Sequence, residues 1–141
     1  MLRPPFAALP PHYAAARAFH MGVHPDRPDV ALLKALRAAN PGALISVEPF
    51  THAAGPGPMS PERVRALVSA GDIFSPNEVE AASIVGPGTL LELVKRLAAA
   101  GAKVVCLRRG ADGAAGTNTY YSPCTLYSAQ CTSLRHVTRH T

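Results

Sequence analysis

The stretch Asp72-Ile-Phe-Ser-Pro-Asn-Glu-Val-Glu-Ala-Ala, residues 72–82, decides the fold because it places a short apolar strand directly before a helix. Ile73 and Phe74 predict the strand, and Ser75-Pro76-Asn77 ends it and begins a helix from residue 78 to about 85. Strands followed at once by helices are typical of parallel α/β sheets. The same alternation is therefore expected on both sides of this stretch.

The flanking sequence repeats the alternation. Short apolar runs predict further strands at residues 18–23, 44–47 and 103–107. Helix-capping residues predict helices that begin after Asp29, Ser60 and Thr89, while Gly101 is expected to end the last of them. Four strands joined by helices predict an α/β fold, in which right-handed connections build a mostly parallel sheet with helices on both faces. Because residues 104–106 are all apolar, we expect that strand to be covered on both sides.

The character of the sequence changes after Ala114. Residues 117–141 contain six Thr and three Ser, no acidic residue and no helical periodicity. We expect residues 116–141 to form an irregular or poorly ordered tail, with at best one edge strand at residues 118–121.

Composition excludes several classes of function. The 141 residues fit one domain, and 48% hydrophobic with 16% charged residues is typical of a folded chain. The net charge of +5 comes mostly from the two ends, because the segment from Asp26 to Asp112 carries only +1. No run of Lys or Arg occurs, so we expect no nucleic-acid partner.

Cysteine content and hydropathy favour a cytoplasmic protein. The chain has three Cys, which leaves at least one unpaired, and no spacing typical of a zinc site. No apolar run is long enough to span a bilayer, so we expect no membrane partner. The Ala-rich first twenty residues, with Arg3 and Arg17 and no acid, leave an organelle transit peptide as an alternative.

Asn77 and Glu80 are the first candidate site. They lie at the start of a predicted helix, where free backbone N–H groups favour a phosphate and a carboxylate can hold a hydrated Mg²⁺. The structural alternative is a capping box, in which Asn77 is the N-cap and Glu80 its partner.

The second candidate is the turn after residue 107. Arg108 and Arg109 are followed by Gly110 and Gly113, and this pattern suits phosphate binding because Arg clamps phosphate and Gly allows close backbone approach. A hairpin turn with solvated arginines explains the pattern equally well. His20, on an apolar strand, is interpreted as a core histidine rather than a catalytic base.

Together the two segments resemble the PfkB (ribokinase-like) carbohydrate kinase family. Residues 75–81 are similar to its Asn-x-x-Glu motif, and residues 104–114 to the strand and glycine turn that follow it. Val47-Glu48-Pro49 lies where many members have Asp-Pro, while Arg108 replaces a threonine of the sugar kinases. The resemblance covers about residues 12–115 and implies a partial, truncated three-layer α/β/α kinase domain.

The resemblance also implies a function and a site. Family members transfer the γ-phosphoryl group of ATP to a sugar or sugar-like hydroxyl. In this chain Asn77 and Glu80 would arrange Mg²⁺ and the phosphates, with Glu80 as the metal ligand, and Arg108, Gly110 and Gly113 would border the ATP site.

The family's catalytic base has no counterpart in this sequence. That base is the Asp of a Gly-Ala-Gly-Asp motif, which is absent here, and no Asp or Glu follows Asp112. We therefore expect a kinase-domain fragment that is inactive alone, with no catalytic residue to assign. The alternative is a non-catalytic nucleotide-binding or interaction remnant that uses an exposed sheet edge.

Overall fold

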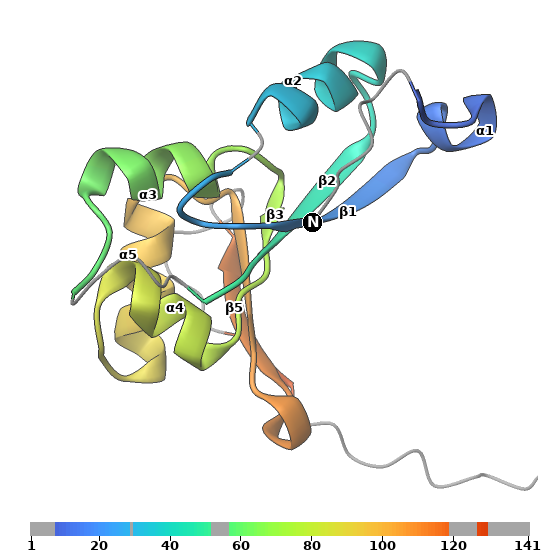
Figure 1. Ribbon diagram of the computed structural model, residues 1–141. Helices are drawn as coiled ribbons and strands as arrows, with labels where there is room; N and C mark the ends of the chain where they lie inside the picture. Colours follow the sequence, from blue (N-terminus) through green and yellow to red (C-terminus); the bar gives the residue numbers. More distant parts are fainter. Residues whose placement is uncertain (1–7, 29, 52–56, 119–126, 130–141) are drawn as a thin grey trace, which may run out of the picture.

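The computed structural model describes residues 8–28, 30–51, 57–118 and 127–129 (Figure 1). The strands are β1 (Ala18–Val23), β2 (Leu44–Pro49), β3 (Ile73–Phe74), β4 (Val104–Arg108), β5 (Ala114–Asn118) and β6 (Tyr127–Ala129). The helices are α1 (Pro11–Ala14), α2 (Val30–Ala39), α3 (Pro61–Val68), α4 (Glu78–Val85) and α5 (Leu90–Ala99), with a turn of 3₁₀ helix, η2 (Gly110–Asp112).

The strands form one sheet in the order in which they occur in the chain, from β1 to β6. β1 to β4 are parallel, with His20 beside Ser46 and Phe74 beside Val105, while β5 and β6 add antiparallel strands at the far edge. The predicted α/β fold with a mostly parallel sheet is therefore confirmed.

Among the described residues, the helices cover one face of this sheet. Strands that follow one another in order, joined by right-handed connections, place every connecting helix on the same side, and Figure 1 shows α2 to α5 gathered there. Burial alternates accordingly: Ile45 and Val47 in β2 are 0% and 1% exposed, whereas Ser46 and Glu48, which follow them in alternation, are only partly buried.

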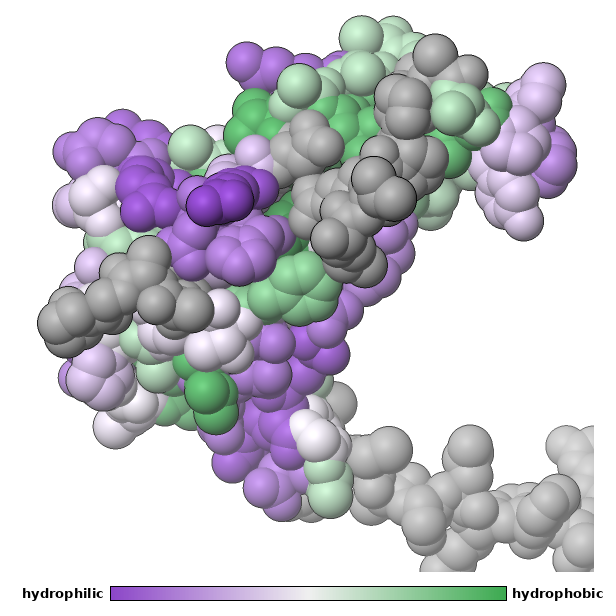
Figure 2. Space-filling model, viewed as in Figure 1, coloured by the Kyte–Doolittle hydropathy of each residue, from purple (hydrophilic) through white to green (hydrophobic). Residues whose placement is uncertain are grey.

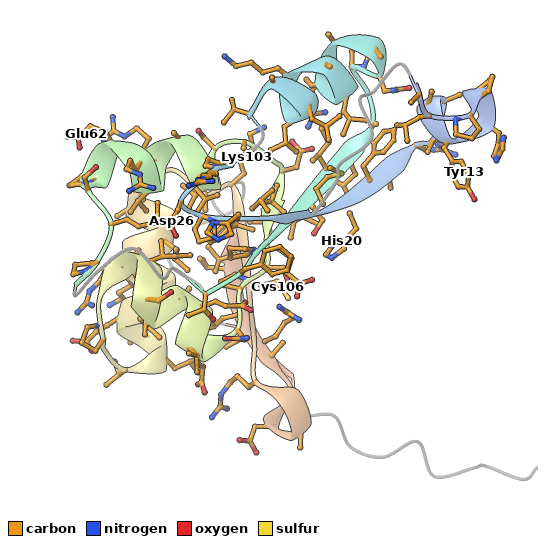
Figure 3. All side chains as sticks on the ribbon, in the orientation of Figure 1. Tyr13, His20, Asp26, Glu62, Lys103 and Cys106 are labelled. Carbon is orange, nitrogen blue, oxygen red and sulfur yellow. The ribbon has the colours of Figure 1, made fainter. Side chains whose placement is uncertain are left out.

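In the described part of the chain the helices lie on one face of the sheet, and the second helical layer expected for a complete three-layer domain is not among these residues. In β4 the side chains of Val105 and Leu107 face the helices and are buried, while Cys106 is only partly buried. Figure 3 shows Cys106 and His20 on the face away from the helices. Three consecutive apolar residues cannot distinguish a strand covered on both sides from one whose second face is open.

The helices begin and end close to the predicted positions. Gly101, with φ of +109°, follows α5 as expected for a helix-ending glycine. α3 begins at Pro61 after Ser60, although the Ser60 side chain makes no capping hydrogen bond. No helix among the described residues is both long and apolar enough to cross a membrane.

Asp72 ties three elements together at the amino ends of the strands. Its carboxylate accepts hydrogen bonds from Ile45 N (2.9 Å) and Lys103 Nζ (3.0 Å), and it pairs with Arg37 of α2. Burial acts to raise the pKa of Asp72, but these hydrogen bonds and the charge of Arg37 outweigh it and lower the pKa. The carboxylate thus stays charged and fixes α2 and β4 relative to β2.

The region expected to be an irregular tail contains strands. β5 runs across the expected boundary at residues 115 and 116, and residues 127–129 form β6, so the expectation is wrong for these segments. The edge strand expected at residues 118–121 lies mostly outside the described residues, as do Cys124 and Cys131. β5 packs closely against β4, since a Cβ atom added at Gly116 would lie 2.2 Å from the backbone oxygen of Val105.

Candidate functional site

Asn77 and Glu80 form a capping box at the start of α4. The side chain of Asn77 accepts a hydrogen bond from Glu80 N (2.8 Å), and the carboxylate of Glu80 accepts one from Asn77 N (2.7 Å). Glu80 is 9% exposed although it is charged. The structural alternative stated for this pair is therefore present, and two of the free N–H groups at the start of the helix are already satisfied.

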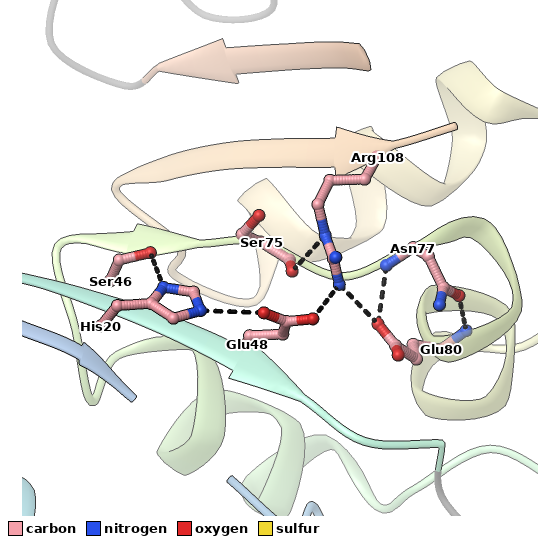
Figure 4. Close-up of polar contacts among 7 residues, drawn as sticks. All are labelled: His20, Ser46, Glu48, Ser75, Asn77, Glu80 and Arg108. Atoms are coloured by element: carbon pink, nitrogen blue, oxygen red, sulfur yellow. Dashed lines mark hydrogen bonds and ion pairs between the residues drawn. The ribbon is translucent and has the colours of Figure 1, made fainter. Parts of the chain in front are cut away.

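Arg108 joins this capping box to the end of β4. Its backbone N donates to Pro76 O (2.8 Å), so the turns after β3 and β4 lie side by side, as predicted for neighbouring parallel strands. The guanidinium donates through Nε to Ser75 O (3.3 Å), and Nη2 lies 3.4 Å from Glu80 Oε2 (Figure 4).

Glu48, at the end of β2, extends the site across the open face of the sheet. Its Oε1 lies 2.5 Å from Arg108 Nη2, and its Oε2 lies 2.8 Å from His20 Nε2 (Figure 4). Burial acts to raise the pKa of Glu48, but the hydrogen bond from His20 and the nearby charge of Arg108 outweigh it and lower the pKa.

His20 is not a core residue. Its side chain is 59% exposed, and its two ring nitrogens lie near Glu48 Oε2 and Ser46 Oγ, the latter at 3.3 Å from Nδ1. The interpretation as a core histidine is wrong because β1 is an edge strand whose outer face no described helix covers.

Gly110 and Gly113 adopt positive φ angles, which glycine accepts readily. The angles are +58° at Gly110 and +86° at Gly113, and Arg109 N donates to Gly113 O (2.8 Å) to close the turn. A Cβ atom added at Gly110 would meet nothing within 4 Å, so space is open beside this turn. Arg109 pairs with Glu78 at the start of α4, with Nε 3.0 Å from Oε1.

The site carries more negative than positive charge. Its carboxylates come from Glu48, Glu78, Glu80 and Asp112, and its guanidinium groups from Arg108 and Arg109. Figure 2 shows hydrophilic residues along the part of the surface where β4 leads into η2. A polyphosphate that approaches this edge needs an accompanying cation to offset the excess of carboxylates.

The residues expected to hold Mg²⁺ do not offer a ready site in this arrangement. Both oxygens of Glu48, Oε2 of Glu80 and Oδ1 of Asn77 already accept hydrogen bonds, and the Arg108 guanidinium lies between the two carboxylates. No group of three or more His, Cys, Asp or Glu side chains suited to a metal ion occurs within the residues described.

The sequence interpretation missed Glu48 and His20 as members of this site. Glu48 was noted only in the family resemblance, although a charged residue before proline at the end of a buried strand was a signal. His20 gave no such signal, because its role depends on the pairing of β1 with β2. The predicted residues Asn77, Glu80 and Arg108 are brought together, with Gly110 and Gly113 in the next turn.

Comparison with known proteins identifies the fold. No family model matches the chain, and no curated protein sequence matches it significantly. Among solved structures, a PfkB protein from Polaromonas superposes with a TM-score of 0.56 at 22% identity, over 82% of this chain and 42% of its own. The chain has part of a ribokinase-like fold.

Other structural neighbours are also kinases of this fold. A pyrophosphate-dependent kinase in the ribokinase family, complexed with a pyrophosphate analog and myo-inositol, gives a TM-score of 0.60 at 16% identity, over 84% of this chain and 42% of that one. Ribokinase from Arabidopsis thaliana, complexed with ribose and ATP, gives 0.53 at 20% identity, over 79% of this chain and 34% of that one. The chain thus spans about two fifths or less of their length, which agrees with the expected partial ribokinase-like domain.

Proposed function

We propose that this chain is the nucleotide-binding part of a ribokinase-like kinase, whose complete domain transfers a phosphoryl group from ATP to a sugar-like hydroxyl. The observation that carries the proposal is the meeting of the α4 N-terminus with the end of β4. There Arg108 contacts the Asn77–Glu80 capping box, next to the open turn at Gly110. Ligands of open parallel sheets bind at this edge, where strands end and helices begin.

The proposed ligand is a nucleotide that arrives with Mg²⁺. The excess of carboxylates at the site opposes a bare polyphosphate, whereas a nucleotide with its own divalent cation carries less charge. Arg109 and the turn at Gly110 are the groups best placed to meet phosphate oxygens, because they border the open space. The expected contact of Mg²⁺ with Glu80 is not part of this proposal, because the guanidinium of Arg108 already lies beside that carboxylate.

We expect no phosphoryl transfer by the 141-residue chain alone. Transfer requires a positioned nucleophile in addition to charge neutralisation. The sequence offers neither a Gly-Ala-Gly-Asp motif nor any acidic residue after Asp112.

Titration of the chain with fluorescent ATP, with and without Mg²⁺, tests the proposal. Saturable binding that requires Mg²⁺ and weakens in Asn77→Ala is expected, and Thr89→Ala is the matched control because Thr89 caps α5 away from the site. The absence of saturable binding would contradict the proposal. A coupled assay with sugars then tests inactivity, which sugar-dependent turnover by the pure chain would disprove.

A second candidate is a non-catalytic interaction module. The open face and edge of the sheet favour an interaction module, because two large apolar side chains are exposed there. Leu44 at the start of β2 is 48% exposed, and Phe50, just after the end of β2, is 42% exposed. Self-association in sedimentation experiments, lost in Leu44→Lys, would support this candidate. A monomer at all concentrations would contradict association through this face.

A further inference from the structure

Arg108 holds one positive charge between two carboxylates from different parts of the chain. Its Nη2 atom lies 2.5 Å from Glu48 Oε1 and 3.4 Å from Glu80 Oε2 (Figure 4). A single guanidinium nitrogen therefore contacts both carboxylates. Without a cation there, two like charges would face each other across a partly solvated edge.

The three side chains are held in place by other contacts. Glu80, whose side chain is 11% exposed, is fixed by its hydrogen bond from Asn77 N, and Glu48 is fixed by His20. The backbone of Arg108 is fixed by Pro76, and its Nε by Ser75 O. The carboxylates and the guanidinium therefore form a prearranged site that already contains a cation.

We propose that the guanidinium of Arg108 takes the place of a resident divalent cation at Glu48 and Glu80. While Arg108 is present the chain binds no divalent cation at this pair, and replacement of Arg108 by a neutral side chain creates such a site. A divalent ion beside the fixed guanidinium would be repelled. Two freed carboxylates completed by water match what Mg²⁺ requires, since it usually keeps several waters.

The inference concerns the same edge of the sheet as the proposed function, but it does not require nucleotide binding. Its experiment contains no nucleotide. If the chain does not bind ATP, the prediction about divalent cations is unaffected. If the prediction about divalent cations fails, the proposed binding of ATP is likewise unaffected.

The test uses Mn²⁺ as the probe and backbone amide signals in NMR spectra of the complete 141-residue chain. In the unaltered protein, the amides of Glu48, Asn77 and Glu80 should broaden no more than that of Glu92, an exposed carboxylate in the second capping box. In Arg108→Met, saturable broadening is expected at residues 48, 77 and 80, with Mn²⁺ binding at least tenfold tighter. Adding Glu48→Gln should abolish the gain.

Arg109→Met is the matched control, since it removes a neighbouring guanidinium that pairs with Glu78 instead. It should gain no Mn²⁺ site at residues 48 and 80. Saturable, selective broadening there in the unaltered protein would overturn the inference, and so would the absence of any gain in a folded Arg108→Met. If that variant does not fold, Arg108→Gln replaces it, and the measurement on the unaltered protein needs no variant.

Discussion

The chain contains two capping boxes built from the same contacts but placed in different surroundings. At α4, Asn77 and Glu80 exchange hydrogen bonds, and at α5, Thr89 and Glu92 do the same. The carboxylate at α4 is buried and also contacts Arg108, whereas the carboxylate at α5 is exposed and accepts hydrogen bonds from Thr89 of its own box.

The two surroundings show that a capping box can have a purely structural role or can be part of a candidate site. The same local pattern begins α5 in solvent and forms part of a polar network at the start of α4. What separates them is the neighbouring strand, because β4 brings Arg108 to the carboxylate of the α4 box, whereas the charge that acts on Glu92 comes from Arg96 in α5 itself. The α5 box is therefore a natural control for the α4 box, and the following predictions compare the two.

The largest expected difference is in stability. Glu80→Ala should lower the free energy of unfolding by about 2–3 kcal/mol, because it removes a cap, leaves Asn77 N without its acceptor and takes a partner from Arg108. Glu92→Ala should cause a clearly smaller loss, since water can replace an exposed carboxylate. Urea unfolding measures both, and equal losses would show that the surroundings of the two boxes do not matter.

The second difference is in ligand binding. Asn77→Ala should weaken the Mg²⁺-dependent binding of ATP about tenfold, which corresponds to about 1.4 kcal/mol, because the start of α4 borders the proposed phosphate site. Thr89→Ala should leave the affinity unchanged although it removes a comparable cap. Equal effects of the two variants would place nucleotide binding elsewhere on the molecule.

The smallest expected effect concerns how stability responds to acid, and it compares Glu48, which contacts Arg108 beside the α4 box, with Glu92 of the α5 box. Hydrogen bonds from His20 and the charge of Arg108 lower the pKa of Glu48 against the effect of burial, and hydrogen bonds from Thr89 lower the pKa of Glu92. A lowered pKa stabilises the fold above the ordinary glutamate pKa of about 4.3, and this stability is lost as the pH falls through the folded-state value.

Glu48→Gln and Glu92→Gln should therefore each flatten the fall in stability below about pH 4.3. For Glu48 the contribution is expected to be less than about 1 kcal/mol, because the pair is partly solvated. Thermal unfolding between pH 3 and pH 7 measures the slope. An unchanged slope in Glu48→Gln would mean that Arg108 and His20 do not hold this carboxylate charged.

The sequence predicted most of the local structure because the signals that begin and end helices are local. Asn77, Thr89 and Gly101 act through hydrogen bonds or backbone angles within a few residues, so their positions could be inferred without a fold. The parallel direction of the first four strands was also predicted, because their connections contain helices.

The covered face of the sheet could not be predicted in this way. An apolar run such as residues 104–106 occurs both in strands covered on one face and in strands covered on both faces. Which of the two is present depends on where the other elements of the fold lie. The strand at residues 114–118 was missed for a related reason, since small residues such as Gly116 are accepted there by close pairing with β4.

Only the residues of the candidate site that lie close together in the sequence could be predicted. Asn77 with Glu80 and the glycine turn are short sequence patterns, whereas the contact between Glu48 and Arg108 joins residues 60 positions apart. Such a contact depends on the register of three neighbouring strands, which one sequence does not reveal. The contact of His20 with Glu48 could not be predicted for the same reason, because only the pairing of β1 with β2 brings the two residues together.

The order of the strands also bears on how the chain folds while it is being made. Each strand from β2 onward pairs with the strand that precedes it in the chain, so every new strand finds its partner already synthesised. The sheet can therefore grow one strand at a time as the chain leaves the ribosome, without waiting for distant residues. Throughout this growth the outer edge of β1 gains no partner from the described strands, so it is the edge that a chaperone would meet first and longest.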